Sequence, residues 1–195
     1  MNEFVLAAFL AFGSLHAFEK LDPKYQIQYG NPAADVKVVE YFSLSCPKCY
    51  EFFERDFPDI QEKLLVSKKA AFIFHPDPAD LLTLQAMVCL EQLPEEKRKL
   101  FFEVILKHLP KESPKNGCLV LQAAMEALNH PVPRLADIDF LEKTEAFNHA
   151  YLFLKQTDVL QTIPMVEING ILRAEYPTAE FLTREIETLS HQRCS

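Results

Sequence analysis

Two cysteines separated by two residues, Cys46 and Cys49, are the part of the sequence best suited to chemistry. Thiols at this spacing can close a small disulfide ring or supply two ligands to a metal ion. An apolar run ends just before them, and a helical apolar pattern begins just after them. The pair is therefore expected where a strand passes into a helix, and the surrounding sequence has to separate the two chemistries.

The remaining cysteines and histidines favour redox chemistry over metal binding. A four-ligand zinc site needs two close cysteine pairs, or one pair with suitably spaced histidines. The chain has five cysteines but no second C-x-x-C, and its six histidines are scattered singly. We therefore expect no metal and no other cofactor. A structural disulfide or half of a metal site is the alternative for the pair.

The residues before the cysteines, 36–42, are nearly continuously apolar and rich in valine, which is typical of a strand covered on both faces. Glu40 lies deep in this run, where a charge is costly unless it is used or neutralised. With a raised pKa, Glu40 would take or give the proton that Cys49 loses and regains. The alternative is a strand charge that reaches the edge of the sheet.

The residues after the first cysteine predict a helix that starts at the pair. Pro47 suits a first helical turn, because the N–H group that it lacks would have no partner there. Cys46 would then lie at a helix start, where unpaired N–H groups stabilise a thiolate, and Lys48 would add a positive charge. Four apolar residues then recur at helical spacing, namely Phe53, Phe57, Ile60 and Leu64. Pro58 falls inside this pattern and predicts a kink in the helix.

The rest of the chain predicts an all-helical block between strands. Short strands are expected over 25–29 and 70–74, followed by helices over 80–93, 94–109, 113–128 and 139–159. Strands return at 165–168 and 171–174, joined by Asn169-Gly170, a strong hairpin signal, and Pro177 opens a last helix. Glu167 is expected to face outward and to pair with Arg173 across the hairpin.

This order resembles the thioredoxin-like pattern, and the helical block resembles that of its DsbA-like branch. Residues 38–50 resemble that family's active-site segment almost position for position, and residues 162–170 resemble its cis-proline loop and hairpin. The resemblance covers the chain from about Tyr25 to the end. It implies an α/β fold of thioredoxin type, with an all-helical domain inserted between the β-α-β half and the C-terminal hairpin and helix.

The resemblance implies a protein thiol-disulfide oxidoreductase, in the first place an oxidase that donates its Cys46–Cys49 disulfide to cysteines of exported proteins. Cys46 matches the nucleophile, Cys49 the resolving thiol, Glu40 the buried acid and Pro164 the cis-proline. The substrate would lie against Ile163, Pro47 and Lys48, with the Ile163 backbone pairing with an extended substrate chain. Lys48 departs from the histidine of the DsbA enzyme itself, which leaves the oxidising strength open.

The same resemblance implies a membrane redox partner, which is a quinone-linked oxidant for an oxidase. The nearest alternative is a reductase or isomerase of the same fold, kept reduced by a membrane electron donor. Isomerases of this kind usually dimerise through a separate N-terminal domain, and only residues 18–24 precede the first strand, which counts against an isomerase. We expect a monomer. A non-catalytic C-x-x-C binding module is a third interpretation of the function.

Three further cysteines receive no catalytic role. Cys89 and Cys118 both fall on helices of the inserted block, where they form either a structural disulfide or two buried free thiols. Cys194 is next to the last residue.

The first residues indicate export. Residues 4–12 form an apolar run too short to span a bilayer, and Ala17 offers a small residue for cleavage. A buried N-terminal helix is the alternative. We expect a signal peptide over 1–17, the thioredoxin-like domain over 18–78 and 161–195, and the helical domain over 79–160. The formal net charge of -8 argues against nucleic acid as a partner, and the cysteine pair fits the periplasm.

Overall fold

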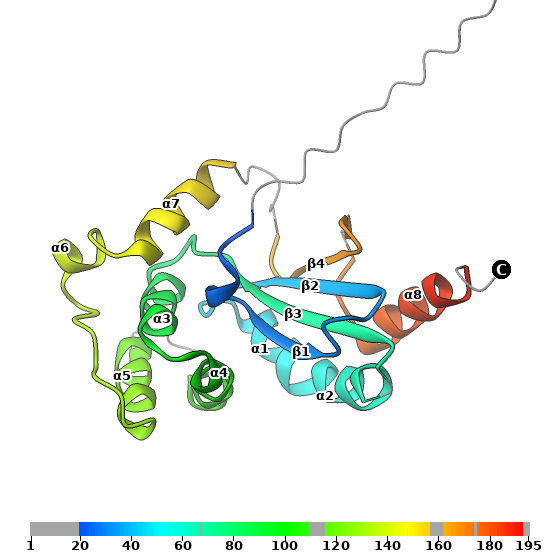
Figure 1. The fold of residues 1–195 in the computed structure, drawn as a ribbon, viewed down its shortest axis with the longest axis horizontal. Coiled ribbons are helices and arrows are strands. Elements are labelled where there is room, and N and C mark those ends of the chain that lie inside the picture. Colours follow the sequence, from blue (N-terminus) through cyan, green and yellow to red (C-terminus); the bar gives the residue numbers. More distant parts are fainter. Residues whose placement is uncertain (1–19, 67, 110–115, 157–161, 174, 193–195) are drawn as a thin grey trace, which may run out of the picture.

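In the computed structural model, the described residues are 20–66, 68–109, 116–156, 162–173 and 175–192. They form a five-stranded sheet with the order β1-β3-β2-β4-β5 (Figure 1). Strands β2 and β3 are parallel, and the other neighbouring pairs are antiparallel. The strands span Ile27–Gly30 (β1), Val36–Phe42 (β2), Ala70–Pro76 (β3), Met165–Ile168 (β4) and Ile171–Arg173 (β5).

Helices cover one face of the sheet and form a separate block beside it. The active-site helix runs as α1 (Pro47–Glu51), a π-helical turn (Phe52–Asp56), α2 (Phe57–Ile60) and a second π-helical turn (Gln61–Leu65). A 3-10 turn, Pro23–Tyr25, precedes β1. No helix of the described ranges combines the length and the apolar character needed to cross a membrane. The other helices are α3 (Leu81–Gln92), α4 (Glu95–His108), α5 (Gly117–Ala127), α6 (Ile138–Leu141), α7 (Glu145–Gln156) and α8 (Ala179–Gln192).

The expected fold class is confirmed. The helices α3 to α7 stand between β3 and β4 in the chain and lie to one side of the sheet, as in a thioredoxin-like fold with an inserted helical block (Figure 1). Strand β2 has the predicted bounds, and Asn169 and Gly170 turn the hairpin with φ values of 48° and 87°. Such positive φ angles are what the Asn-Gly pair supplies in a two-residue hairpin.

The predicted single helix over 139–159 is wrong, because the chain forms α6 and α7 with a break between them. Thr144 causes the break: its hydroxyl donates to the carbonyl of Leu141 and accepts from the amide of Phe147. A threonine that bonds the backbone in this way ends one helix and caps the next. Residues 157–159 and the predicted start at Ser113 lie outside the described residues.

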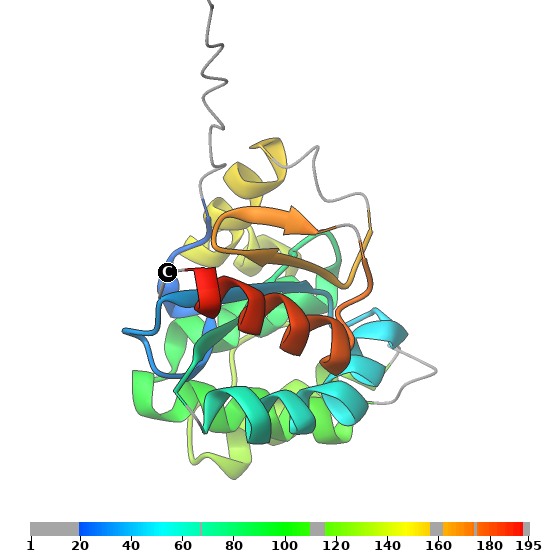
Figure 2. The same cartoon turned by 90° about the vertical axis from the view of Figure 1, so that its right-hand side faces the viewer.

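Pro58 is accommodated by a wider turn of the active-site helix. The amide of Phe57 donates to the carbonyl of Phe52, five residues earlier, in place of the usual four. A proline removes one donor from the helical ladder, and π-helical turns relieve such local irregularities. The helix therefore continues through Pro58, and α8 lies alongside it on the same face of the sheet (Figure 2).

Aromatic rings fill the space between this face of the sheet and the active-site helix. Phe74 of β3 lies at its centre, with ring-centroid distances of 4.8 Å to Phe57 and 5.1 Å to Phe72. The cluster continues into the helical block, because Phe102 of α4 lies 5.1 Å from Phe74 and 5.2 Å from Phe42. Edge-to-face and tilted rings at these distances attract one another beyond their simple burial. The abundance of phenylalanine therefore reflects one core shared by the sheet and the block.

The opposite face of β2 and β4 carries a buried polar cluster. Glu167 points inward, contrary to expectation: it accepts from the hydroxyl of Tyr41 at 3.0 Å and pairs with Lys20 at 2.6 Å. The pleat decides this, since Glu167 lies opposite Val39 in the register and therefore shares a face with Tyr41. Arg173 pairs instead with Glu185 of α8, at 3.2 Å.

Replacement of Phe102 should test how strongly the helical block is joined to the sheet. We expect Phe102→Ala to lower the free energy of unfolding by about 3–5 kcal/mol, because the ring is fully buried and its loss leaves a cavity. Leu100→Ala, on the exposed side of the same helix, should cost under about 0.5 kcal/mol. Urea unfolding of both variants measures the difference, and equal losses would contradict a shared core.

Candidate active site

Cys46 lies where β2 ends and the active-site helix begins. It is the N-cap residue of α1, with extended backbone angles, and Pro47 occupies the first helical turn as expected. Cys46 is part-exposed, whereas Cys49, one turn later, is 6% exposed. Both are free thiols in this structure. The sequence thus folds locally into a helix start that presents one sulfur to solvent and buries the other.

The environment of Cys46 stabilises its thiolate. A hydrogen bond from the Cys49 thiol, helped by the backbone N–H groups of Cys49 and Lys48 and by the Lys48 charge, lowers the pKa of Cys46 to about 6, although partial burial opposes the shift. These N–H groups belong to the first turn of the helix, where the helix dipole favours a negative charge. A thiol with this pKa is largely ionised at neutral pH and reacts as a nucleophile.

Cys49 is in the opposite situation. Its hydrogen bond to Cys46, its burial and the nearby Glu40 charge all raise the pKa of the Cys49 thiol. Glu40 itself is fully buried, and neither of its carboxyl oxygens has a hydrogen-bond partner among the described residues. Burial, with a contribution from Cys46, raises the pKa of Glu40 well above its usual range. A buried acid with a raised pKa therefore lies close to the two thiols.

The sheet register explains why Glu40 faces the thiols. Glu40 lies opposite Phe74 of β3 and Val166 of β4, on the face that the active-site helix covers. Its neighbour Tyr41 lies opposite His75, on the other face. Because alternate residues of a strand point to opposite faces, only this register places the acid beneath the helix.

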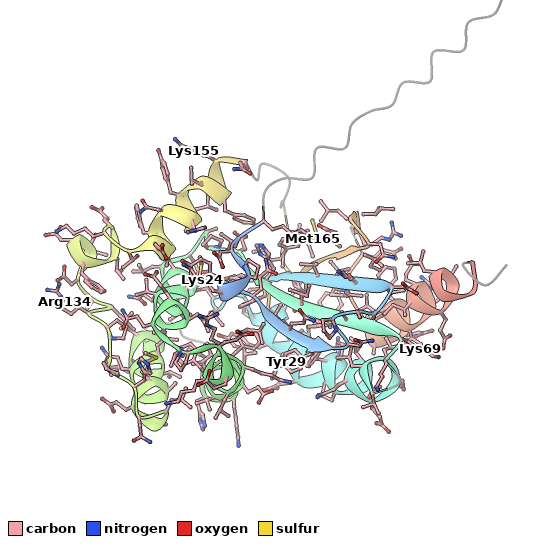
Figure 3. All side chains as sticks on the ribbon, in the orientation of Figure 1. Lys24, Tyr29, Lys69, Arg134, Lys155 and Met165 are labelled. Carbon is pink, nitrogen blue, oxygen red and sulfur yellow. The ribbon has the colours of Figure 1, made fainter. Side chains whose placement is uncertain are left out.

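The loop before β4 completes the site. The Ile163–Pro164 peptide bond is cis, as expected, and the Cys46 thiol donates to the carbonyl oxygen of Ile163 at 3.5 Å. Pro164 is buried and Ile163 is part-exposed. Met165, labelled in Figure 3, follows as the first residue of β4. Segments more than a hundred residues apart in the chain thus meet at one sulfur.

The family model described as thioredoxin matches residues 22–188. The chain belongs to the thioredoxin family. Several solved structures share its fold. Two of them are Wolbachia pipientis alpha-DsbA1, at 21% identity and a TM-score of 0.65, covering 86% of this chain and 92% of that one, and oxidised BdbD from Bacillus subtilis, at 19% identity and a TM-score of 0.63, covering 87% and 95%.

Curated relatives match the thioredoxin-family chain over shorter stretches. A Rickettsia bellii protein with the provisional name protein-disulfide oxidoreductase is 31% identical over 90 residues, which cover 45% of this chain and 34% of that protein. The matched part of the chain therefore spans about a third of the length of this relative.

Two features of this thioredoxin-family site were not predicted from the sequence. Tyr176, which precedes α8, donates from its hydroxyl to the carbonyl of Lys48 at 3.2 Å, and the guanidinium of Arg55 lies 5.9 Å from its ring. Asp80, before α3, accepts hydrogen bonds from Ser43 and Ser45 of the loop that leads to Cys46. Neither contact has a local sequence signal, because both join residues distant in the chain.

The other cysteines lie away from this site. Cys89 is fully buried and Cys118 is part-buried; both are free thiols in this structure. Burial, with a contribution from Cys118, raises the pKa of Cys89, so the two thiols are near one another. Their pairing in an oxidising compartment stays a prediction. Cys194 lies outside the described residues, as does the expected signal peptide over 1–17. Among the residues that are described, no three histidine, cysteine or acidic side chains gather as metal ligands would.

Alkylation should reveal the thiolate of Cys46 directly. We expect the rate of Cys46 modification by iodoacetamide to rise with pH through a midpoint of about 6, because the thiolate is the reactive form. Cys49→Ala should move the midpoint upward, since the largest stabilising contact is the Cys49 thiol. Mass spectrometry of the modified peptides measures each site, with Cys89 as the unreactive control. A midpoint near 8.5, the value of an ordinary cysteine, would contradict this environment.

Proposed function

We propose that this chain is an exported protein thiol-disulfide oxidoreductase, and specifically an oxidase that donates its Cys46–Cys49 disulfide to cysteines of exported proteins. The contrast between its two thiols is the observation that carries the proposal. The pKa of Cys46 is lowered to about 6, whereas that of Cys49 is raised. A stabilised Cys46 thiolate favours the reduced enzyme, and a disulfide whose reduced form is stabilised is the stronger oxidant.

The first step is attack by a substrate thiolate on the sulfur of Cys46. The bond between Cys46 and Cys49 breaks, and a mixed disulfide forms between the substrate and Cys46. Attack at Cys46 follows from exposure, because Cys46 is part-exposed and Cys49 is buried. Cys49 leaves as a thiolate in surroundings that disfavour its charge, so it must be protonated promptly.

Glu40 is the proposed source of that proton. Its carboxyl group is buried, its pKa is raised well above the usual range, and it lies close enough to Cys49 to influence the pKa of that thiol. A neutral acid near the leaving thiolate acts as a general acid, and as a base in the reverse direction. In the second step, another substrate thiolate attacks the substrate sulfur of the mixed disulfide. Cys46 leaves as a thiolate, so that the substrate is oxidised and the enzyme is reduced by two electrons.

The substrate chain would lie against Pro47, Lys48 and Ile163. Pro47 and Lys48 are exposed, and the Ile163 carbonyl faces Cys46 across 3.5 Å. An extended peptide that bonds to the Ile163 backbone would be held next to the reactive sulfur without dependence on its sequence. Pro164 fixes the direction of this backbone in the proposal. This arrangement suits an enzyme with many protein substrates.

The names of similar proteins support the class of reaction. One curated relative is provisionally named a protein-disulfide oxidoreductase, and two proteins of similar structure are alpha-DsbA1 and BdbD. The export-like segment 1–17 supports the periplasm as the location. The enzyme would act there as a monomer, and a quinone-linked membrane protein would reoxidise the dithiol.

The equilibrium of the cysteine pair with glutathione decides between an oxidase and a reductase. We expect a reduction potential near about -120 mV, because a stabilised Cys46 thiolate makes the disulfide oxidising. A value near about -270 mV would support the reductase alternative instead. Metal analysis of the reduced protein and turnover of insulin test the third possibility, a binding module. Bound metal or a lack of turnover would contradict the enzyme assignment altogether.

Glu40→Gln should slow the reaction without loss of the fold. We expect exchange at neutral pH to fall by about 10²-fold, because the proton for Cys49 must then come from water. Glu167→Gln is the matched control, since Glu167 is buried in the same sheet but on its other face. Cys46→Ser sets the inactive background, and Cys49→Ser should accumulate mixed disulfides. Equal rates for Glu40→Gln and the wild type in refolding of a reduced substrate would contradict the role of Glu40 as the general acid for Cys49.

A further inference from the structure

One carboxylate joins the active-site loop to the inserted helical block. Asp80 stands immediately before α3 and accepts hydrogen bonds from three residues. The hydroxyls of Ser43 and Ser45, from the loop before Cys46, donate at 2.6 and 2.8 Å. The amide and hydroxyl of Thr83, in the first turn of α3, donate at 2.9 and 2.6 Å. Both carboxylate oxygens therefore bridge the loop and the helix.

Two of these hydroxyls pass the contact on to the loop backbone. The Ser43 oxygen, while donating to Asp80, accepts from the amide of Ser45 at 3.0 Å. The Thr83 oxygen likewise donates to Asp80 and accepts from the amide of Leu44 at 2.9 Å. Hydroxyls that donate and accept at the same time give connected networks in which each bond strengthens the next. All three residues between β2 and Cys46 are thus held through Asp80.

The same loop determines where the two sulfurs lie. The amide of Cys46 donates to the carbonyl of Ser43 at 3.2 Å. The backbone N–H of Ser43 faces the Cys49 sulfur and favours its ionised form. The Tyr50 hydroxyl also donates to the carbonyl of Leu44. A shift of Ser43 would therefore displace the nucleophile and its partner together.

We propose that Asp80 is a positioning residue for Cys46, which it holds over the helix start by fixing Ser43 and Ser45. The inference rests on the proposed role of Cys46 as the nucleophile. The helical block would then contribute directly to the chemistry of the cysteine pair, in addition to covering it. An active-site group gains from such supporting hydrogen bonds because they keep it in its reactive position.

The number of bonds separates this role from ordinary helix capping. A cap needs one acceptor for an amide of the first turn, and serine serves as well as aspartate there. Asp137 offers the comparison within the same block: it caps α6 by accepting from the amide of Phe140 at 3.0 Å. Asp80 caps α3 in the same way but has two additional donors from the active-site loop.

Asp80→Ser and Asp137→Ser test the proposal as a matched pair in the full chain. Both variants keep a capping side chain, but only Asp80→Ser loses the contact with the loop. We expect Asp80→Ser to raise the pKa of Cys46, measured by thiolate absorbance, and to reduce the thiolate fraction near pH 6 about threefold to tenfold. Its equilibrium with glutathione should shift towards the disulfide, whereas Asp137→Ser should match the wild type in both measurements.

The loss of a negative charge acts in the opposite direction, because it would lower the pKa of a nearby thiol. The double variant Ser43→Ala/Ser45→Ala removes both loop bonds to Asp80, and with them the bond from the Ser45 amide to the Ser43 hydroxyl, but no charge. It should also raise the pKa of Cys46. The double variant tests the positioning role of Asp80 even where Asp80→Ser fails to fold. An unchanged or lowered pKa in this double variant would overturn the proposal. An ordinary pKa for Cys46 in the wild type would instead contradict the proposed function itself.

Discussion

The contact between the Cys46 sulfur and the N–H groups at the start of the active-site helix is the interaction on which the site depends. The first amides of a helix lack the usual carbonyl partner four residues earlier. Here the Cys49 thiol contributes most to the lowered pKa of Cys46, and the amides of Cys49 and Lys48 add to it. Serine, threonine or aspartate usually takes this N-cap position. A cysteine there gives the helix a charged partner only as a thiolate. The helix start and the ionised sulfur therefore stabilise each other.

The rest of the sheet and its helices keep the second thiol in contrasting surroundings. Cys49 is only three residues from Cys46, and the difference in their pKa values comes from the hydrogen bond between the two thiols, from the burial of Cys49 and from Glu40. The pleat of β2 supplies the contribution of Glu40, because it turns Glu40 towards the helix and Tyr41 away from it. A shift of one residue in register would exchange the acid for a phenol. The long apolar strand is thus a requirement of the chemistry as well as of the core.

The sequence predicted most features that depend on neighbouring residues, with the break at Thr144 as an exception, and missed several that depend on distant ones. The strand 36–42 and the Asn169–Gly170 turn follow from local apolar pattern and backbone preference, and both are found as expected. The break at Thr144 was missed because threonine is tolerated inside helices and caps them equally well. The inward direction of Glu167 follows from its register with Val39 of β2, which lies far from it in the chain. The partners of Asp80 are likewise distant, and periodicity carries no information about them.

The helical block meets the site through two contacts of different character. Phe102 packs its ring into the aromatic core, and this contact stabilises the folded state. It tolerates a range of orientations of the block, since rings attract over a range of angles and distances. The hydrogen bonds of Asp80 are directional and weaken steeply when their geometry is lost. An apolar contact alone would hold the block against the sheet without defining the position of the loop. The polar contact therefore supplies the precision that a reactive sulfur needs, and the inserted block becomes part of the active site.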